Sequence, residues 1–233
     1  MRGSVVRAAL IDLDGTLLDT LPDLASAANR MLAKLGLAPL PQARVRDFVG
    51  KGVAHLVRRC LAAALGGETP ADSVLARADV VFGDAYEEES GRCTALYPGV
   101  VAGLDDMAEQ GLRLACVTNK IGRFTAPLLE RTGLAPRFAA VICGDQVTRL
   151  KPDPEPYFLA CAKLGAPAAN AVVIGDSAND MIAGRAAGCR VLCVPYGYTE
   201  GVDASSLDCD ARVENLMEAA RYMRRLNEQE AVR

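Results

Sequence analysis

The chain has 233 residues, of which 51% are hydrophobic and 24% charged, a balance that supports a buried core and excludes a disordered chain. Its formal net charge of −3 offers no basic surface to nucleic acid. No segment approaches the roughly 20 apolar residues of a membrane helix, and the first ten residues lack the apolar stretch of an export signal. We therefore expect a cytoplasmic protein that binds neither nucleic acid nor a membrane.

The first predicted strand, residues 5–11, is followed by a long interval that holds only helical patterns. These patterns, separated by Gly and Pro clusters, cover residues 23–35, 42–48, 53–65 and 71–89. An insertion at this point would lie above the carboxyl ends of the strands, where open α/β sheets bind ligands. The interval predicts a helical cap domain, residues 21–95, set into a catalytic core formed by residues 1–20 and 96–233.

Beyond the interval, short apolar runs alternate with helical patterns. The runs are too short for helices and rich in Val, Ile and Leu, as is typical of buried parallel strands; they cover residues 112–117, 141–143, 172–174 and 191–194. Helical periodicity, ended each time by a glycine, covers residues 100–110, 123–132, 154–164 and 179–187. An amphipathic pattern follows over 214–226. The alternation predicts an α/β fold with a doubly wound, Rossmann-like parallel sheet.

Two carboxylates, Asp12 and Asp14, directly follow the first predicted strand. Residues two apart on an extended chain point to the same side, and Gly15 permits a sharp turn behind them. Polar residues also follow the later predicted strands: Thr118, Asn119, Lys151, Asp176 and Asp180. Because the carboxyl ends of parallel strands meet at one edge of a sheet, we expect these side chains to form one site.

These residues fall in four segments of the chain: Asp12 with Asp14, Thr118 with Asn119, Lys151, and Asp176 with Asp180. The four segments resemble the four signature motifs of the haloacid dehalogenase superfamily. The match spans residues 5 to about 213, and the helical interval corresponds to that superfamily's small helical cap. Ile11 stands where relatives commonly have Phe before the first Asp, which exchanges one apolar strand end for another.

A cluster of four carboxylates would repel both its own members and a phosphate dianion. A hard divalent cation resolves this conflict, and Mg²⁺ suits a site of few carboxylates plus substrate phosphate. The resemblance implies Asp12 and Asp176 as side-chain ligands and Asp14 as a ligand through its backbone carbonyl. It implies that Asp180 supports the ligands from outside. We therefore expect Mg²⁺ as the cofactor.

A carboxylate that attacks phosphorus forms an aspartyl phosphate and divides hydrolysis into two easier steps. The resemblance implies Asp12 as this nucleophile. It implies Asp14 as the acid that protonates the leaving alkoxide and then as the base that activates water. Thr118 and the Asn119 backbone would hold phosphoryl oxygens, while Lys151 offsets their charge. Dehalogenating relatives need no acid for a halide, so Asp14 favours a phosphatase.

Within the superfamily the chain is most similar to bacterial phosphoglycolate phosphatases, at residues 13–19, 22–24, 49–52, 117–120, 126–130, 175–180, 187–189 and 196–198. Gly50 and Gly52 bracket Lys51 at the start of a predicted helix, where free backbone amides bind anions. Lys51, with His55 and Arg58 nearby, is a candidate contact for the carboxylate of 2-phosphoglycolate. For His55, simple packing on a half-buried helix face is the plainer interpretation.

Three other functions stay open. A phosphatase for another small phosphoester (a phosphosugar, N-acetylmuramic acid 6-phosphate or a nucleotide) would use the same site. A phosphomutase would pass the phosphoryl group to a sugar, but mutases of this superfamily usually carry Val where Thr16 stands. A non-catalytic phosphate-binding protein would be expected to lack Asp12, Asp14 or Lys151. The sequence allows a monomer or a homodimer.

Overall fold

The main sheet of the computed structural model, which describes residues 5–232, has six parallel strands in the order β5-β4-β1-β6-β7-β8. Residues 1–4 and 233, which the sequence assigns to the core, lie outside the described residues. The strands are β1 (Ala8–Ile11), β4 (Arg113–Val117), β5 (Ala140–Ile142), β6 (Ala171–Gly175), β7 (Arg190–Cys193) and β8 (Ala211–Arg212). The α/β fold predicted from the sequence is confirmed.

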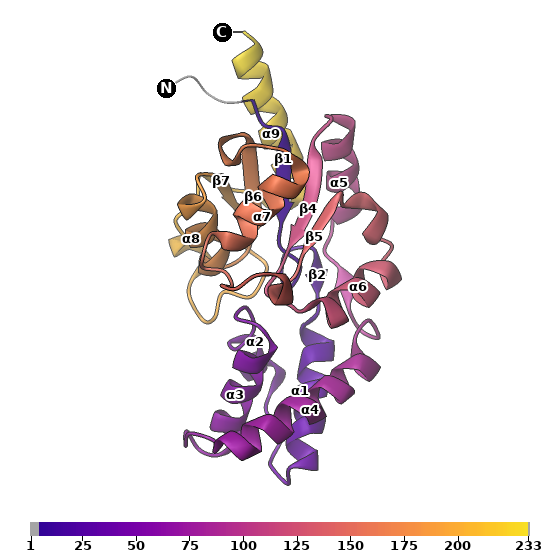
Figure 1. Cartoon of the computed structure of the whole chain (residues 1–233), viewed down its shortest axis with the longest axis vertical. Coiled ribbons are helices and arrows are strands. Elements are labelled where there is room, and N and C mark those ends of the chain that lie inside the picture. The colour runs from indigo at the N-terminus through magenta and orange to yellow at the C-terminus, as the bar shows by residue number, and fades with distance from the viewer. Residues whose placement is uncertain (1–4, 233) are drawn as a thin grey trace.

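Two helical layers cover the sheet (Figure 1). On one face lie α5 (Val100–Glu109), α6 (Gly122–Arg131) and α9 (Leu216–Ala231); on the other lie α7 (Glu155–Leu164) and α8 (Ala178–Ala186). Strand β1 follows a period of two: Ala9 and Ile11 pack into the first layer, Ala8 and Leu10 into the second. A strand that is buried on both faces has a continuous run of apolar residues, which is why β1 could be predicted from the sequence.

Strand order reverses beside β1, whose neighbours are β4 on one side and β6 on the other. The chain leaves β1 toward β4 and β5, and later returns to build β6, β7 and β8 outward from the other side. A reversal of this kind opens a crevice at the carboxyl ends of the strands, the usual ligand position in open α/β sheets. The ends of β1, β4 and β6 therefore define the place to look for a site.

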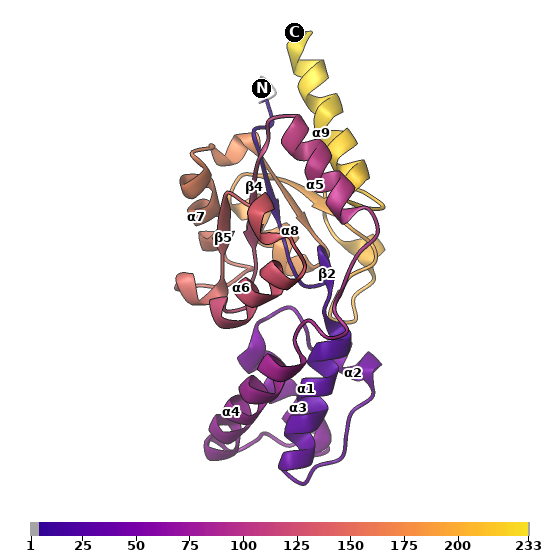
Figure 2. The same cartoon turned by 90° about the vertical axis from the view of Figure 1, so that its right-hand side faces the viewer.

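Four helices form a separate layer beyond those strand ends: α1 (Leu21–Lys34), α2 (Gln42–Arg46), α3 (Val53–Ala64) and α4 (Asp72–Glu89), called here the helical module (Figures 1 and 2). The module has its own cluster of buried apolar side chains, including Phe48, Phe82 and Tyr86. Phe124 of α6 joins this cluster, so the module is packed against the layer above it. The division into two domains at residues 21 and 95 stays a prediction.

A two-stranded antiparallel ribbon, β2 (Leu18–Asp19) and β3 (Ala95–Leu96), joins the two chain segments that lead into and out of the module. Buried Asp23, in the first turn of α1, accepts hydrogen bonds from the backbone N–H of Gly91, Cys93 and Thr94 at 2.8, 2.8 and 3.0 Å. The two connections are therefore held side by side.

The structure extends some predicted elements. Helix α9 ends at Ala231 rather than near residue 226, because residues 228–231 (Glu, Gln, Glu and Ala) are good helix formers that carry no hydrophobic period. Strands β2, β3 and β8 have two residues each, too few for a pattern to register. Within residues 5–232, none of the helices combines the length and apolar character needed to traverse a bilayer.

Candidate active site

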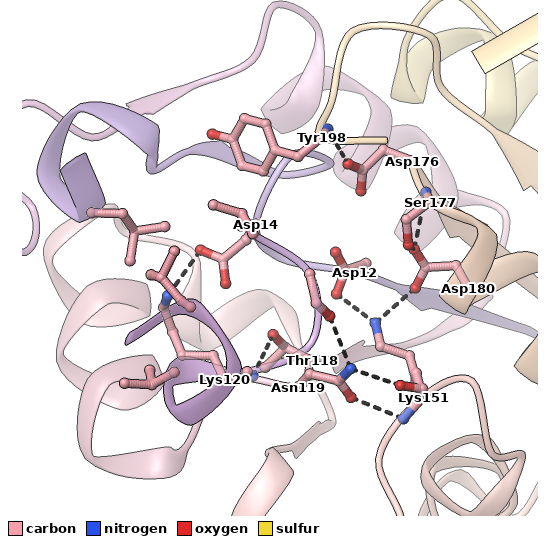
Figure 3. A pocket seen from close by; sticks show the side chains of 16 residues that line it. Asp12, Asp14, Thr118, Asn119, Lys120, Lys151, Asp176, Ser177, Asp180 and Tyr198 are labelled. Atoms are coloured by element: carbon pink, nitrogen blue, oxygen red, sulfur yellow. Dashed lines mark hydrogen bonds and ion pairs between the residues drawn. The ribbon is translucent and has the colours of Figure 1, made fainter. Parts of the chain in front are cut away.

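A small cavity of about 40 Å³ lies between the carboxyl ends of the strands and the helical module (Figure 3). The strand-end residues singled out in the sequence meet there: Asp12, Asp14, Thr118, Asn119, Lys151, Asp176 and Asp180. The module contributes Leu24, Val49, Gly50, Gly52, Val53 and Leu56, and the remaining lining residues are Lys120, Ser177 and Tyr198. The cavity therefore has a charged wall from the sheet and a mainly apolar wall from the module.

Lys151 lies at the centre of the charged wall. Its Nζ donates to Asp12 Oδ1 at 2.6 Å, Asp180 Oδ1 at 2.7 Å and the Val117 carbonyl at 2.8 Å. An ammonium group has three N–H donors, so all of them are used. Burial lowers the pKa of Lys151, but the two carboxylates outweigh it and hold that pKa above its ordinary value.

Asp180 is fixed by neighbours other than Lys151. Its Oδ1 also accepts from the Tyr157 hydroxyl at 3.0 Å, and its Oδ2 accepts from the Ser177 hydroxyl at 2.7 Å. Ser177 caps α8 and Asp180 occupies the third helical position, which is a capping box. Local helix-start chemistry therefore sets the position of a carboxylate that in turn orients Lys151.

The Asp176 carboxylate is packed so closely against Gly15 and Gly197 that neither position has room for a side chain. Its Oδ1 accepts from the Thr16 hydroxyl at 2.8 Å and its Oδ2 from the Tyr198 N–H at 2.5 Å. A Cβ atom on Gly15 or Gly197 would come within 2.3 or 2.1 Å of Asp176 Oδ2. Glycine is thus required at both positions for this carboxylate to face Asp12.

Asp14 is held by two partners on the module side of the cavity. Its Oδ1 accepts from the Thr20 hydroxyl at 2.6 Å and pairs with Lys120 Nζ at 3.0 Å. The Lys120 side chain is buried, and its Nζ lies 4.9 Å from the ring centroid of Tyr86 on α4. The sequence interpretation gave Lys120 no role, although its place at the end of a predicted strand, next to Asn119, was a usable signal.

Asn119 connects three segments. Its side chain exchanges two hydrogen bonds with the Lys151 backbone, each of 2.9 Å, and donates a third to the Gly50 carbonyl at 3.0 Å. Thr118 Oγ1 accepts from the Lys120 N–H at 3.2 Å. These bonds fix the loops after β4 and β5 relative to each other and to the start of α3.

The acidic cluster fits a divalent cation. One oxygen each from Asp12, Asp176 and Asp180 lie within 4.8 Å of one another. Burial, the largest effect, raises the pKa of Asp12 to about 7, and burial with the neighbouring carboxylates raises that of Asp176 well above its ordinary value. Together with Asp14, four carboxyl groups face two lysine ammonium groups, so the acidic groups outnumber the cationic ones. A hard divalent ion would favour the ionised form of these groups and match their oxygen ligands.

The cationic candidates of the module lie elsewhere. Lys51 pairs with Glu200 at 2.5 Å, and His55 is half-buried on α3, where burial, followed by Lys51 and Arg59, lowers its pKa. Neither is among the described residues that line the cavity. Gly50 and Gly52, which bracket Lys51, do line it. Contact of Lys51 or His55 with a substrate stays a prediction.

Comparison with known proteins gives concordant matches. The family model for haloacid dehalogenase-like hydrolases matches residues 9–194. The chain is 47% identical to a phosphoglycolate phosphatase of Nitrosospira multiformis, over 94% of this chain and 96% of that protein. It is 46% identical to a plasmid-encoded phosphoglycolate phosphatase of Cupriavidus necator, over 90% and 89% of the two chains. A crystal structure described as a predicted phosphoglycolate phosphatase from Haemophilus somnus superposes with a TM-score of 0.89 at 28% identity, covering 94% and 98%.

Proposed function

This chain belongs to the haloacid dehalogenase-like hydrolases, and from that premise we propose that it converts 2-phosphoglycolate to glycolate and phosphate with Mg²⁺ as cofactor. It is a phosphoric monoester hydrolase. The observation that carries the proposal is the placement of Asp14 beside Asp12 at the cavity, because an alkoxide leaving group needs an acid next to the nucleophile. The names of the full-length relatives supply the substrate.

In the proposed first step Asp12 attacks phosphorus while the bond between phosphorus and the ester oxygen breaks. Lys151 donates to Oδ1 of Asp12 at 2.6 Å, which fixes the carboxylate and leaves its other oxygen to act as the nucleophile. Asp14 gives its proton to the departing glycolate oxygen. The products of this step are an aspartyl phosphate on Asp12 and free glycolate.

In the second step Asp14, now a carboxylate, takes a proton from water as that water attacks phosphorus. The bond between phosphorus and Asp12 breaks, and phosphate leaves. The Thr118 hydroxyl and the Asn119 backbone, from residues that line the cavity, would hold phosphoryl oxygens, and Lys151 would offset their charge. Asp12, Asp176 and the Asp14 carbonyl would hold Mg²⁺, with Asp180 supporting them, and the bound ion would neutralise phosphoryl charge.

The apolar wall of the cavity supports a small substrate. Leu24, Val49, Val53 and Leu56 present no hydrogen-bonding side chains to a ligand. The hydroxyls of a sugar or nucleotide would lose their water there without protein partners, which costs free energy for each group buried. Glycolate carries one carboxylate and a single methylene beyond the ester oxygen, so it has no hydroxyl groups that would lose their water against this wall.

We expect phosphate release from 2-phosphoglycolate with a kcat/KM at least about 100-fold above that for sugar phosphates, nucleotides and N-acetylmuramic acid 6-phosphate. The measurement is phosphate release by the purified full chain across this panel, with Mg²⁺ and with EDTA. Activity should vanish in EDTA and return when Mg²⁺ is added in excess. Metal-dependent release led by a different ester would remove the 2-phosphoglycolate assignment and leave the phosphatase.

The raised pKa of Asp12 predicts a pH-dependent effect of Mg²⁺ on stability. Burial holds the folded-state pKa near 7, above the ordinary value of 3.8, so the contribution of Asp12 to stability is present below pH 3.8 and is lost as pH rises through 7. A cation offsets this loss only where the carboxylate is ionised. We expect the rise in Tm on adding Mg²⁺ to be larger at about pH 8 than at about pH 5.

Calorimetry with EDTA and with saturating Mg²⁺ at both pH values measures this difference. Asp12→Asn removes the titrating group, and in this variant the Mg²⁺-dependent rise in Tm should be small at both pH values. Equal rises in the native chain at both pH values would show that the cation does not bind the Asp12 cluster.

A further inference from the structure

We propose that Lys120 binds the carboxylate of the substrate, an inference that rests on the function proposed above. Lys120 lies in the loop between β4 and α6 and lines the cavity beside Asp14 (Figure 3). The sequence pointed instead to Lys51, His55 and Arg58 on the module. Three properties of the cavity favour Lys120.

The first property is the supply of positive charge. In the part of the chain that the structure describes, Lys120 and Lys151 are the cationic side chains that line the cavity. All three donors of Lys151 are used within the protein, by Asp12, Asp180 and the Val117 carbonyl. Lys120 pairs with Asp14 at 3.0 Å and lies against the Tyr86 ring, so at least one of its three donors remains for a ligand.

The second property is the geometry of the ester. Asp14 must reach the ester oxygen of the substrate to protonate it. In 2-phosphoglycolate the carboxylate carbon is two bonds from that oxygen, so a group in contact with Asp14 is within reach of the carboxylate. Lys120 and Lys151 lie on opposite sides of Asp12 and Asp14 (Figure 3). This separation places one ammonium at the phosphoryl end of the substrate and the other at the carboxylate end.

The third property is the strength of charge interactions in the cavity. The side chain of Lys120 is only 3% exposed, so a carboxylate beside it is poorly screened by water and salt. Among the described residues, no basic side chain of the module lines the cavity. Lys51 pairs with Glu200, Arg59 lies over the Phe48 ring, and Arg46 donates to the Gly197 carbonyl.

The test compares two esters that differ only at one end: 2-phosphoglycolate, and 2-hydroxyethyl phosphate, in which CH₂OH replaces the carboxylate. In Lys120→Met, we expect kcat/KM for 2-phosphoglycolate to fall about 30-fold or more beyond the fall for 2-hydroxyethyl phosphate. The additional loss should lie mainly in KM. A loss common to both esters measures the missing contact between Lys120 and Asp14. Because both esters are assayed on the same preparation, the ratio does not depend on the folded fraction.

Two further variants serve as controls. Lys120→Arg retains the charge and should restore part of the preference for 2-phosphoglycolate. Lys163→Met changes an exposed lysine of α7 and should leave both esters unaffected. Equal losses for the two esters in Lys120→Met would overturn the inference and leave Lys120 as a positioning residue for Asp14.

The competing hypothesis is tested by Lys51→Ala. A selective loss for 2-phosphoglycolate in that variant, without one in Lys120→Met, would assign the carboxylate to Lys51 and overturn the inference. Failure of the proposed function is a different result: the native chain would hydrolyse both esters with similar kcat/KM. A native chain that prefers 2-phosphoglycolate, with Lys120→Met retaining that preference, would reject the role of Lys120 alone.

Discussion

Replacing Asp12 with Asn should lower kcat for 2-phosphoglycolate by about 10³-fold or more while the fold is retained. An amide oxygen of the same shape is a poor nucleophile toward phosphorus, so the aspartyl phosphate cannot form. The remaining carboxylates and Lys151 stay in place. In the metal-free protein the substitution also removes a buried carboxylate with a pKa near 7. We therefore expect Asp12→Asn to unfold in EDTA at pH 8 no more easily than the native chain.

Phosphate release, circular dichroism and thermal unfolding measure these three outcomes. Asp208→Asn, which changes an exposed carboxylate paired with Arg185, is the matched control and should retain full activity. Acid quenching during turnover of labelled substrate should leave phosphate on the native chain and none on Asp12→Asn. Unchanged turnover in Asp12→Asn would place the nucleophile elsewhere and remove the two-step mechanism.

The sequence predicted most of the charged wall of the cavity, with Lys120 as the exception, because the predicted residues follow the ends of predicted strands. Asp12 follows a buried strand, and Asp176 follows another; parallel strands place both at one edge of the sheet. Lys151 lies in a loop, yet it is brought to Asp12 by the order of strands in the sheet, which the alternation of apolar runs and helices already implied. A correct prediction of the parallel sheet therefore also predicted that Asp12, Asp176 and Lys151 lie together.

The lysine that lies beside Asp14 could not be chosen in the same way. Lys51 and Lys120 are both lysines near glycine or polar residues, and the sequence favoured Lys51 because it begins a helix. The structure pairs Lys51 with Glu200, 149 residues away along the chain. It brings Lys120 to Asp14, which lies on a different strand end. Whether Lys51 faces the cavity depends on how the module packs, and no local pattern encodes that packing. Lys120 follows a predicted strand, β4 (Arg113–Val117), so its position was open to prediction.

The connections to the module depend on contacts of the same long-range kind. The Tyr198 hydroxyl accepts from the N–H groups of Thr20 and Leu21 at 2.9 and 3.0 Å and donates to Asp19 at 2.6 Å. A single side chain near the carboxyl terminus thus holds the start of α1. Two-residue strands and one distant tyrosine leave no periodic trace in the sequence. The backbone N–H of the same tyrosine donates to Asp176. Tyr198 therefore contacts both the start of α1 and the acidic cluster.

Replacing Lys151 with Met should have the largest effect on stability. The substitution keeps most of the length of the side chain but leaves Asp12 and Asp180 buried without their shared cation. Breaking a buried ion pair by removing one partner costs about 3–5 kcal/mol in the free energy of unfolding. We expect that loss in EDTA, together with a fall in kcat of about 10²–10³-fold, because Lys151 no longer fixes Asp12 or offsets the phosphoryl charge. Added Mg²⁺ should recover part of the stability, because a cation again faces the carboxylates.

The matched control for this prediction is Lys51→Met, which removes an ion pair of nearly the same length. Lys51 lies 2.5 Å from Glu200 and Lys151 lies 2.6 Å from Asp12, but their side chains are 43% and 3% exposed. An exposed pair contributes about 1 kcal/mol or less, so urea unfolding should separate the two variants by several kcal/mol. Adding Asp180→Asn to Lys151→Met should restore part of the stability and none of the activity. Equal unfolding midpoints for the two single variants would show that burial does not govern the strength of the Lys151 pair.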